Sequence, residues 1–207
     1  MKEEEIVRLK AMWEIEESLF EKGYENVAGV DEAGRGPLAA EVYAAAVILP
    51  KGVFIEGLND SKKLSEKKRE KLFDEICSSA QAYAIATASV EEIDEYNIRN
   101  ATYMAMNRAI EALSIKPDFV MVDGDCIKNC NYSYECVVKG DAKSISIAAA
   151  SVLAKVARDR HMLALAEKYP QYGFEKHKGY GTAAHIAALK EFGACEVHRK
   201  TFIKKFV

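Results

Sequence analysis

The stretch from Val27 to Pro37, Val-Ala-Gly-Val-Asp-Glu-Ala-Gly-Arg-Gly-Pro, constrains the fold of this chain more than any other segment. A short apolar run of strand type leads into two adjacent carboxylates, Asp31 and Glu32, and then into a loop with two glycines and a proline. Because side chains alternate along a strand, two neighbouring acids can converge only where the strand ends. Glycine and proline predict that end directly after the acids. The stretch therefore predicts a strand whose exit presents carboxylates.

The same residues allow a plainer interpretation. Asp31 and Glu32 could form a polar turn with Arg35 as their ion-pair partner, and spacing alone favours that alternative. The glycines on either side of Arg35, however, leave the backbone bare enough for a ligand to approach the main-chain amides closely. Such a loop suits a polyanion.

Two further acids stand at comparable places in the sequence. Residues 117–125 contain a buried β run that ends in Asp123 followed by glycine, which repeats the design of the first strand. Asp141 comes just ahead of a long helix predicted for residues 144–169. If the two acid-bearing strands are parallel neighbours, their carboxylates will meet at one edge of the sheet. Taken singly, a turn acid and a helix N-cap are the commoner roles for Asp123 and Asp141.

A cluster of four carboxylates has a definite chemical consequence. Without compensation the acids would repel one another and take up protons, so the cluster predicts bound cations. Oxygen ligands, with no histidine or cysteine among them, favour Mg²⁺ or Mn²⁺ over zinc. Two such ions about 4 Å apart can activate a water molecule and stabilise the leaving oxygen of a phosphodiester. The acids therefore indicate nuclease chemistry.

The remaining sequence predicts an α/β layer structure with a mixed sheet of five strands flanked by helices. Residues 1–22 have apolar positions at helical spacing, and Val42 to Pro50 reads as a second strand in a hairpin with the first. Four more elements are predicted: a helix beginning near Ser65, a strand from Gln81 to Val90, helical segments within Glu91 to Leu113 that are interrupted at Asn97, and a strand from Tyr132 to Val138.

Charge, cysteine content and apolar runs indicate which compartment and which binding partners suit this chain. The net charge of −3 over 207 residues does not mark a general nucleic-acid binder, so any basic surface must be local. Five cysteines, an odd number, without an apolar signal segment favour a reducing compartment. No apolar run is long enough to span a bilayer. We expect a soluble cytoplasmic protein that acts as a monomer and does not bind membranes.

Over nearly its whole length, the sequence resembles the ribonuclease HII family, the type 2 ribonucleases H. The resemblance is carried, in the family's order, by Gly29-Val-Asp-Glu-Ala-Gly-Arg-Gly-Pro-Leu38, Asp60-Ser-Lys-Lys-Leu64, Val122-Asp-Gly124, Lys139-Gly-Asp141, Ser146-Ile-Ala-Ala-Ala-Ser151, His177-Lys-Gly-Tyr-Gly-Thr182 and His198-Arg199. It implies a ribonuclease H-like fold in which residues 1–170 form the catalytic domain. Residues 171–207 would then form a small C-terminal helical extension packed on that domain.

The resemblance also implies an activity and a set of site residues. Family members are metal-dependent endoribonucleases that cut the RNA strand of RNA-DNA hybrids, and cut 5′ to single ribonucleotides embedded in duplex DNA, leaving a 3′-hydroxyl. They serve ribonucleotide excision and RNA primer removal. The matching catalytic acids and ligands of two Mg²⁺ or Mn²⁺ ions are Asp31, Glu32, Asp123 and Asp141. The matching substrate-binding residues are Gly34, Arg35 and Gly36 at the ribose 2′-hydroxyl, Tyr180 at the following sugar, and Lys62, Lys143, Ser144 and Ser146 at phosphates.

The sequence departs from the family pattern at two places. Ala40-Glu41 stands where family members usually have Gly-Pro, and Glu196 replaces a second proline. With only 30 residues ahead of Asp31, we expect no extra N-terminal domain of the ribonuclease HIII kind.

A resolvase or transposase of the same fold would share the acids but lack the Gly-Arg-Gly loop and Tyr180. A non-catalytic hybrid-binding module would gain nothing from paired metals.

Overall fold

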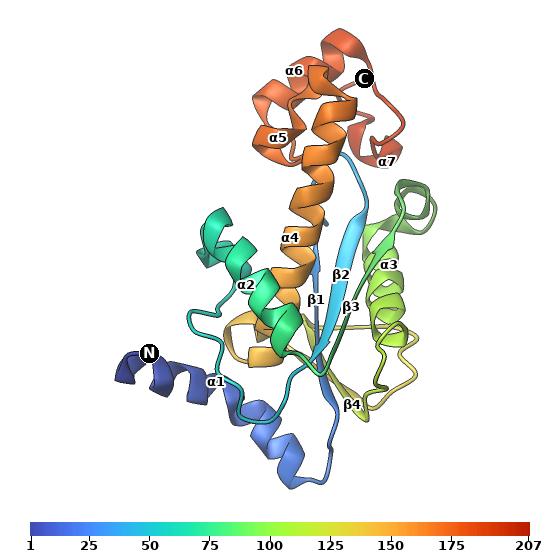
Figure 1. Ribbon diagram of the computed structural model, residues 1–207. Coiled ribbons are helices and arrows are strands. Elements are labelled where there is room, and N and C mark those ends of the chain that lie inside the picture. Colours follow the sequence, from blue (N-terminus) through green and yellow to red (C-terminus); the bar gives the residue numbers. More distant parts are fainter.

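A mixed sheet of five strands, in the order β3-β2-β1-β4-β5, forms the centre of the computed structural model, which describes residues 1–207 (Figure 1). Strand β1 pairs antiparallel with β2, which pairs antiparallel with β3, whereas β1–β4 and β4–β5 are parallel pairs. The predicted hairpin is therefore confirmed, and the two acid-bearing strands are parallel neighbours, which is the arrangement that brings their ends together. The strands are β1 Val27–Ala33, β2 Val42–Ile48, β3 Ala82–Ala88, β4 Phe119–Asp123 and β5 Tyr134–Val137.

Helices cover both faces of the sheet. The long helix α4 lies along one face together with α1 and α2, and α3 covers the other face (Figure 1). Three short helices, α5 to α7, gather around the C-terminal end of α4. The helices are α1 Glu3–Glu21, α2 Glu66–Ser79, α3 Val90–Glu111, α4 Ile145–Lys168, α5 Phe174–His177, α6 Ala183–Phe192 and α7 Lys200–Ile203, with 3₁₀ turns η1 Ser61–Lys63, η2 Gly140–Ala142 and η3 Pro170–Tyr172.

Local side-chain chemistry explains where several helices begin. Ser65 accepts a hydrogen bond from the Lys68 backbone amide at the start of α2, and Thr182 caps α6 in the same way. Ser89 and Glu92 form a capping box at the start of α3. Within α3, Asn97 has φ 64° and ψ 161°, which interrupts the helix at the residue where the sequence predicted a break. None of the helices combines the length and the apolar character that a membrane span needs.

Close packing of α4 against β1 depends on a glycine. A Cβ atom at Gly29 would lie 2.2 Å from the Ser146 carbonyl carbon and 2.3 Å from the Ile147 nitrogen. The first half of α4 is rich in alanine and buried, which allows the same close approach along its length. This contact places the start of α4, and the η2 turn before it, beside β1.

Strand β1 is one residue longer than the sequence predicted. It was expected to end directly after Glu32, but Ala33 still pairs with Tyr43 of β2. The hairpin partner supplies the pairing that extends the strand. As a result, Asp31 and Glu32 both lie within regular β structure, and this affects how they are oriented.

Candidate active site

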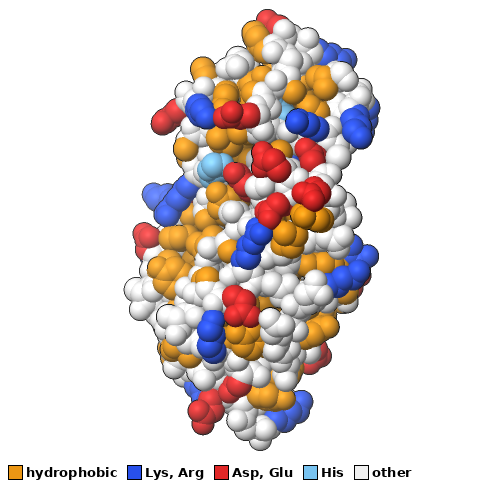
Figure 2. Space-filling model, turned by 90° about the vertical axis from the view of Figure 1, so that its right-hand side faces the viewer, with side chains coloured by type: hydrophobic (Ala, Val, Ile, Leu, Met, Phe, Trp, Pro, Cys, Tyr) orange, Lys and Arg blue, Asp and Glu red, His pale blue; other side chains and the backbone are white.

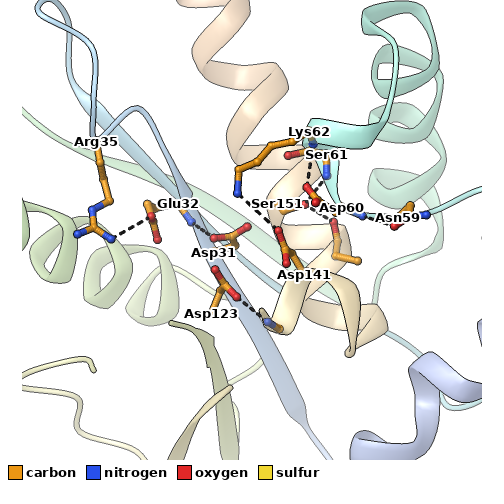
Figure 3. A network of polar contacts seen from close by, with 12 residues as sticks. Asp31, Glu32, Arg35, Asn59, Asp60, Ser61, Lys62, Asp123, Asp141 and Ser151 are labelled. Atoms are coloured by element: carbon orange, nitrogen blue, oxygen red, sulfur yellow. Dashed lines mark hydrogen bonds and ion pairs between the residues drawn. The ribbon is translucent and has the colours of Figure 1, made fainter. Parts of the chain in front are cut away.

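Three carboxylates from different elements meet at one end of the parallel strand pair (Figure 3). Asp31 lies on β1, Asp123 ends β4, and Asp141 lies in the η2 turn ahead of α4. One carboxylate oxygen from each residue lies within 4.8 Å of the others. The structure thus brings together three of the four acids that the sequence singled out, because β1 and β4 are parallel neighbours and η2 packs beside them.

Glu32 lies outside the group of three carboxylates that are within 4.8 Å of one another, although it is near enough for the charge of Asp123 to raise its pKa. Because β1 continues through Ala33, successive side chains take different directions. The Glu32 carboxylate lies 3.6 Å from the Arg35 guanidinium, on the side of β1 away from Asp141 (Figure 3). Burial raises the pKa of Glu32 and the Arg35 charge opposes that shift. Glu32 therefore forms the ion pair with Arg35 that the polar-turn interpretation predicted for both acids, and Asp31 does not.

Burial and mutual repulsion make the three-acid group a site for a cation. Burial raises the pKa of Asp31 well above its ordinary value, and the charges of Glu32 and Asp123 raise it further. Burial also raises the pKa of Asp141, with Asp123 adding to the effect. The donors are all carboxylate oxygens, a set that fits Mg²⁺ or Mn²⁺. A divalent cation here would relieve the repulsion that the fold imposes.

Lys62 is the basic side chain nearest to these acids. Its Nζ atom lies 3.6 Å from Asp141 Oδ2, and its side chain is 77% exposed. Partial burial works against the charge of Lys62, but the carboxylates of Asp31 and Asp141 raise its pKa overall. On the face shown in Figure 2, Lys and Arg side chains are scattered among acidic ones.

The η2 turn is held against β4 by a hydrogen bond from a backbone amide to a side-chain carboxylate. The Gly140 amide donates to Asp123 Oδ1 at 2.6 Å. A Cβ atom at Gly140 would lie 2.6 Å from Ile147 Cδ1 and 3.3 Å from Asp123 Oδ1, so only glycine fits here without displacement. The turn therefore sets the distance between the carboxylates of Asp123 and Asp141.

Ser144 and Ser146, which the family resemblance implies as phosphate contacts, are buried. Glu16 of α1, also buried, accepts hydrogen bonds from Ser144 Oγ at 2.7 Å and from the Ser146 amide at 3.0 Å. Neither serine side chain is open to a phosphate in this arrangement. Lys143 is exposed but lines a separate cavity of about 570 Å³ beside α1. Of the four implied phosphate contacts, only Lys62 lies beside the acids.

The glycine-rich loop and Tyr180 line a smaller cavity of about 180 Å³ that also includes Asp31 and Lys62. The Tyr180 side chain is 47% exposed, which excludes a role as a core residue. A Cβ atom at Gly36 would lie 3.5 Å from a Tyr180 ring carbon, so the ring lies directly against the loop. The loop, the tyrosine and the acids therefore share one surface.

Sequence reasoning assigned no role to two side chains of α4 in this cavity. Lys155 lines it and forms an ion pair with Asp159 at 2.6 Å. Arg158, only 1% exposed, donates hydrogen bonds to the carbonyls of Ala39 and Lys178. Charged residues in an otherwise apolar stretch of helix were the available signal, because burial of a charge requires specific partners. Glu16, in the lead-in helix, carried no comparable signal.

Comparisons with known proteins place nearly the whole chain beside one family. A family model described as "Ribonuclease HII" matches residues 28–205. A ribonuclease HII from Caldicellulosiruptor bescii is 54% identical over 195 residues, which cover 94% of this chain and 95% of that protein. The crystal structure of the ribonuclease H2 from Pyrococcus horikoshii OT3 is similar with a TM-score of 0.74 and 29% identity, covering 88% of this chain and 97% of that one. The structure of a PCNA:RNase HII complex from Archaeoglobus fulgidus gives a TM-score of 0.71 at 28% identity, covering 84% and 94%.

Proposed function

This chain belongs to the ribonuclease HII family and is a type 2 ribonuclease H, an endonuclease, and from this premise we propose its substrates and mechanism. It cleaves the RNA strand of RNA-DNA hybrids and cuts 5′ to single ribonucleotides embedded in duplex DNA, leaving a 3′-hydroxyl. It does so by hydrolysis that depends on two divalent metal ions. Its role is to remove ribonucleotides and RNA primers in the cytoplasm. It acts as a monomer, in which residues 1–170 form the catalytic domain and residues 171–207 form a helical extension.

The observation that carries this proposal is the group of three carboxylates within 4.8 Å of one another. Asp31, Asp123 and Asp141 would hold the metal ions, and Glu32 follows Asp31 on β1. When bound, Mg²⁺ or Mn²⁺ supplies an activated water and stabilises the leaving oxygen of the phosphodiester. A resolvase would use similar acids, so the choice of substrate depends on the rest of the cavity.

The rest of the cavity suits a ribose. The loop of Gly34, Arg35 and Gly36 contacts the 2′-hydroxyl through its backbone, since this hydroxyl distinguishes RNA from DNA. Tyr180, half-exposed against the loop, packs on the sugar that follows the ribonucleotide. Lys62 contacts a phosphate and holds the duplex in register without reading its sequence.

The test compares three duplexes: one with a single embedded ribonucleotide, the same duplex made only of DNA, and an RNA-DNA hybrid. Each is incubated with Mg²⁺, with Mn²⁺ or with a chelator. We expect metal-dependent cleavage 5′ to the ribonucleotide and within the hybrid, with products that a DNA polymerase can extend from the 3′-hydroxyl. Cleavage of the all-DNA duplex would favour a resolvase, and binding without cleavage would favour a hybrid-binding module.

A further inference from the structure

A buried arginine from the C-terminal segment is hydrogen-bonded to the glycine-rich loop. Arg199 is 0% exposed and donates through all three guanidinium nitrogens. Its acceptors are backbone carbonyls of one short stretch: Ala40 at 2.8 Å, Arg35 at 2.9 Å, Pro37 at 2.8 Å and Gly34 at 2.6 Å. The donor and the loop are as much as 165 residues apart in the sequence. One side chain therefore binds the loop along its whole length.

Two of these carbonyls determine where the loop's amides point. A trans peptide unit is planar, with its C=O and N–H directed to opposite sides. The Gly34 carbonyl belongs to the same peptide unit as the Arg35 N–H, and the Arg35 carbonyl to the same unit as the Gly36 N–H. Because Arg199 draws both carbonyls toward the protein interior, both N–H groups are directed away from it. Neither N–H donates a hydrogen bond within the chain.

Backbone contacts between the same two segments reinforce this arrangement. The Arg199 amide donates to the Leu38 carbonyl at 2.9 Å, and the Ala40 amide donates to the Val197 carbonyl at 2.8 Å. Ala40 has φ 69°, a left-handed conformation that is unfavourable for a residue with a Cβ atom. Its carbonyl accepts from Arg199 Nε in that conformation. The C-terminal segment therefore imposes a backbone shape that alanine at this position does not favour.

A second buried arginine closes the other side of the loop. Arg158 of α4 donates to the Ala39 carbonyl at 3.1 Å and to the Lys178 carbonyl at 3.0 Å, two residues before Tyr180. A Cβ atom at Gly34, where φ is 99°, would lie 2.2 Å from Arg158 Nε. The loop is thus confined between α4 and the C-terminal segment. Its two glycines would otherwise make it conformationally free.

We propose that Arg199 is a positioning residue, which holds the Arg35 and Gly36 N–H groups in the direction that binding the ribose of the substrate requires. This inference rests on the proposed function, because it assumes that the loop contacts the 2′-hydroxyl. Arg199 itself lies behind the loop and does not touch the substrate. A misplacement of a positioned group by about 1 Å can lower the rate roughly 100-fold, so we expect the loss of Arg199 to show in kcat.

The experiment measures kcat and KM on the single-ribonucleotide duplex for wild type, Arg199→Ala and Arg199→Lys. Leu189→Ala is the matched control, because Leu189 is buried in the same C-terminal apolar cluster and does not bond to the loop. Each protein is assayed at the same interval below its own Tm. We expect Arg199→Ala to lower kcat by roughly 10- to 100-fold with little change in KM, and Leu189→Ala to keep a kcat near that of wild type. Arg199→Lys, which keeps the charge but has a single donor group, should fall between them.

A readout that does not depend on the loop separates positioning from general damage. The rise in Tm on adding Mg²⁺ or Mn²⁺ reports on the acids, and we expect Arg199→Ala to retain it. A loss of that rise, or a kcat no lower than that of Leu189→Ala, would overturn the inference. If Arg199→Ala does not fold, Arg199→Lys decides, and a wild-type kcat in that variant would overturn it equally. Failure of the wild-type protein to cut the duplex would instead contradict the proposed function.

Discussion

Replacing Asp31 with asparagine should stabilise the metal-free protein while abolishing cleavage. Asp31 is 4% exposed, and its pKa is raised by burial and by the charges of Glu32 and Asp123. Asparagine removes the charge at nearly constant volume. Its side-chain oxygen can still accept the hydrogen bond that the Glu32 amide donates to Asp31 Oδ1 at 2.7 Å. The substitution therefore changes the electrostatics of the site more than its packing.

The size of the gain follows from the spacing of the carboxylates. Two unit charges 4.8 Å apart repel by about 3.5 kcal/mol at an effective dielectric constant of about 20, and Asp31 faces two such neighbours. Lys62, 3.6 Å from Asp141 Oδ2, offsets part of this repulsion, and proton uptake by the wild-type acid limits the rest. We expect a net gain of about 2 kcal/mol in the free energy of unfolding. For a chain of this length that corresponds to a rise in Tm of about 4–8 °C.

The gain should depend on pH in a direction set by the raised pKa. A carboxyl group whose pKa is higher in the folded state stabilises the fold below its unfolded pKa, and that contribution is lost as the pH rises through the folded value. The gain in the free energy of unfolding of Asp31→Asn over wild type should therefore be largest at about pH 8. It should vanish at about pH 4, because the wild-type acid is protonated at that pH. Added Mg²⁺ should reverse the order, since only the wild-type group of acids binds it tightly.

Thermal unfolding followed by circular dichroism, after treatment with a chelator, measures these differences. Asp125→Asn is the control: this acid lies two residues after Asp123, but its side chain is 84% exposed and outside the group. We expect it to change stability by less than about 0.5 kcal/mol. The reasoning would be refuted if metal-free Asp31→Asn were no more stable than wild type near about pH 8, because the carboxylates would then not repel one another.

Two further substitutions test the support of the site and its contact with substrate. Glu16→Ala should lower the free energy of unfolding by about 2–3 kcal/mol, because it leaves the buried Ser144 hydroxyl and Ser146 amide without an acceptor. Urea unfolding measures this, and Glu16→Gln, which keeps an acceptor oxygen, should lose clearly less; equal losses would contradict the hydrogen-bond explanation. Lys62→Ala should weaken hybrid binding for all sequences. It should also reduce the slope of the logarithm of the binding constant against the logarithm of the salt concentration by about 1, as expected for the loss of one phosphate contact. Anisotropy titrations at several salt concentrations measure the slope, and an unchanged slope would remove Lys62 from the substrate contacts.

The sequence by itself determined the features that depend on short-range chemistry. Alternating and apolar runs predicted five strands, and the helix starts predicted near Ser65 and residue 144 lie within one residue of the observed starts of α2 and α4. The two acid-bearing strand exits predicted that Asp31 and Asp123 would meet, since parallel neighbours bring equivalent ends together. Each of these features follows from residues within one turn or strand of each other, or from the rules of strand pairing.

Only the tertiary structure decided how the site is completed. The pairing of Ala33 with Tyr43 continues β1, and Glu32 then lies toward Arg35. Glu16 accepts hydrogen bonds from the two serine residues that the family resemblance implied as phosphate contacts. Arg199 reaches the Gly34 loop from the other end of the chain. No local pattern records such contacts, because they arise when segments far apart in sequence bury polar groups together and each group needs a partner. The acids of this protein can be recognised in its sequence, whereas the direction in which its loop faces is a property of the assembled fold.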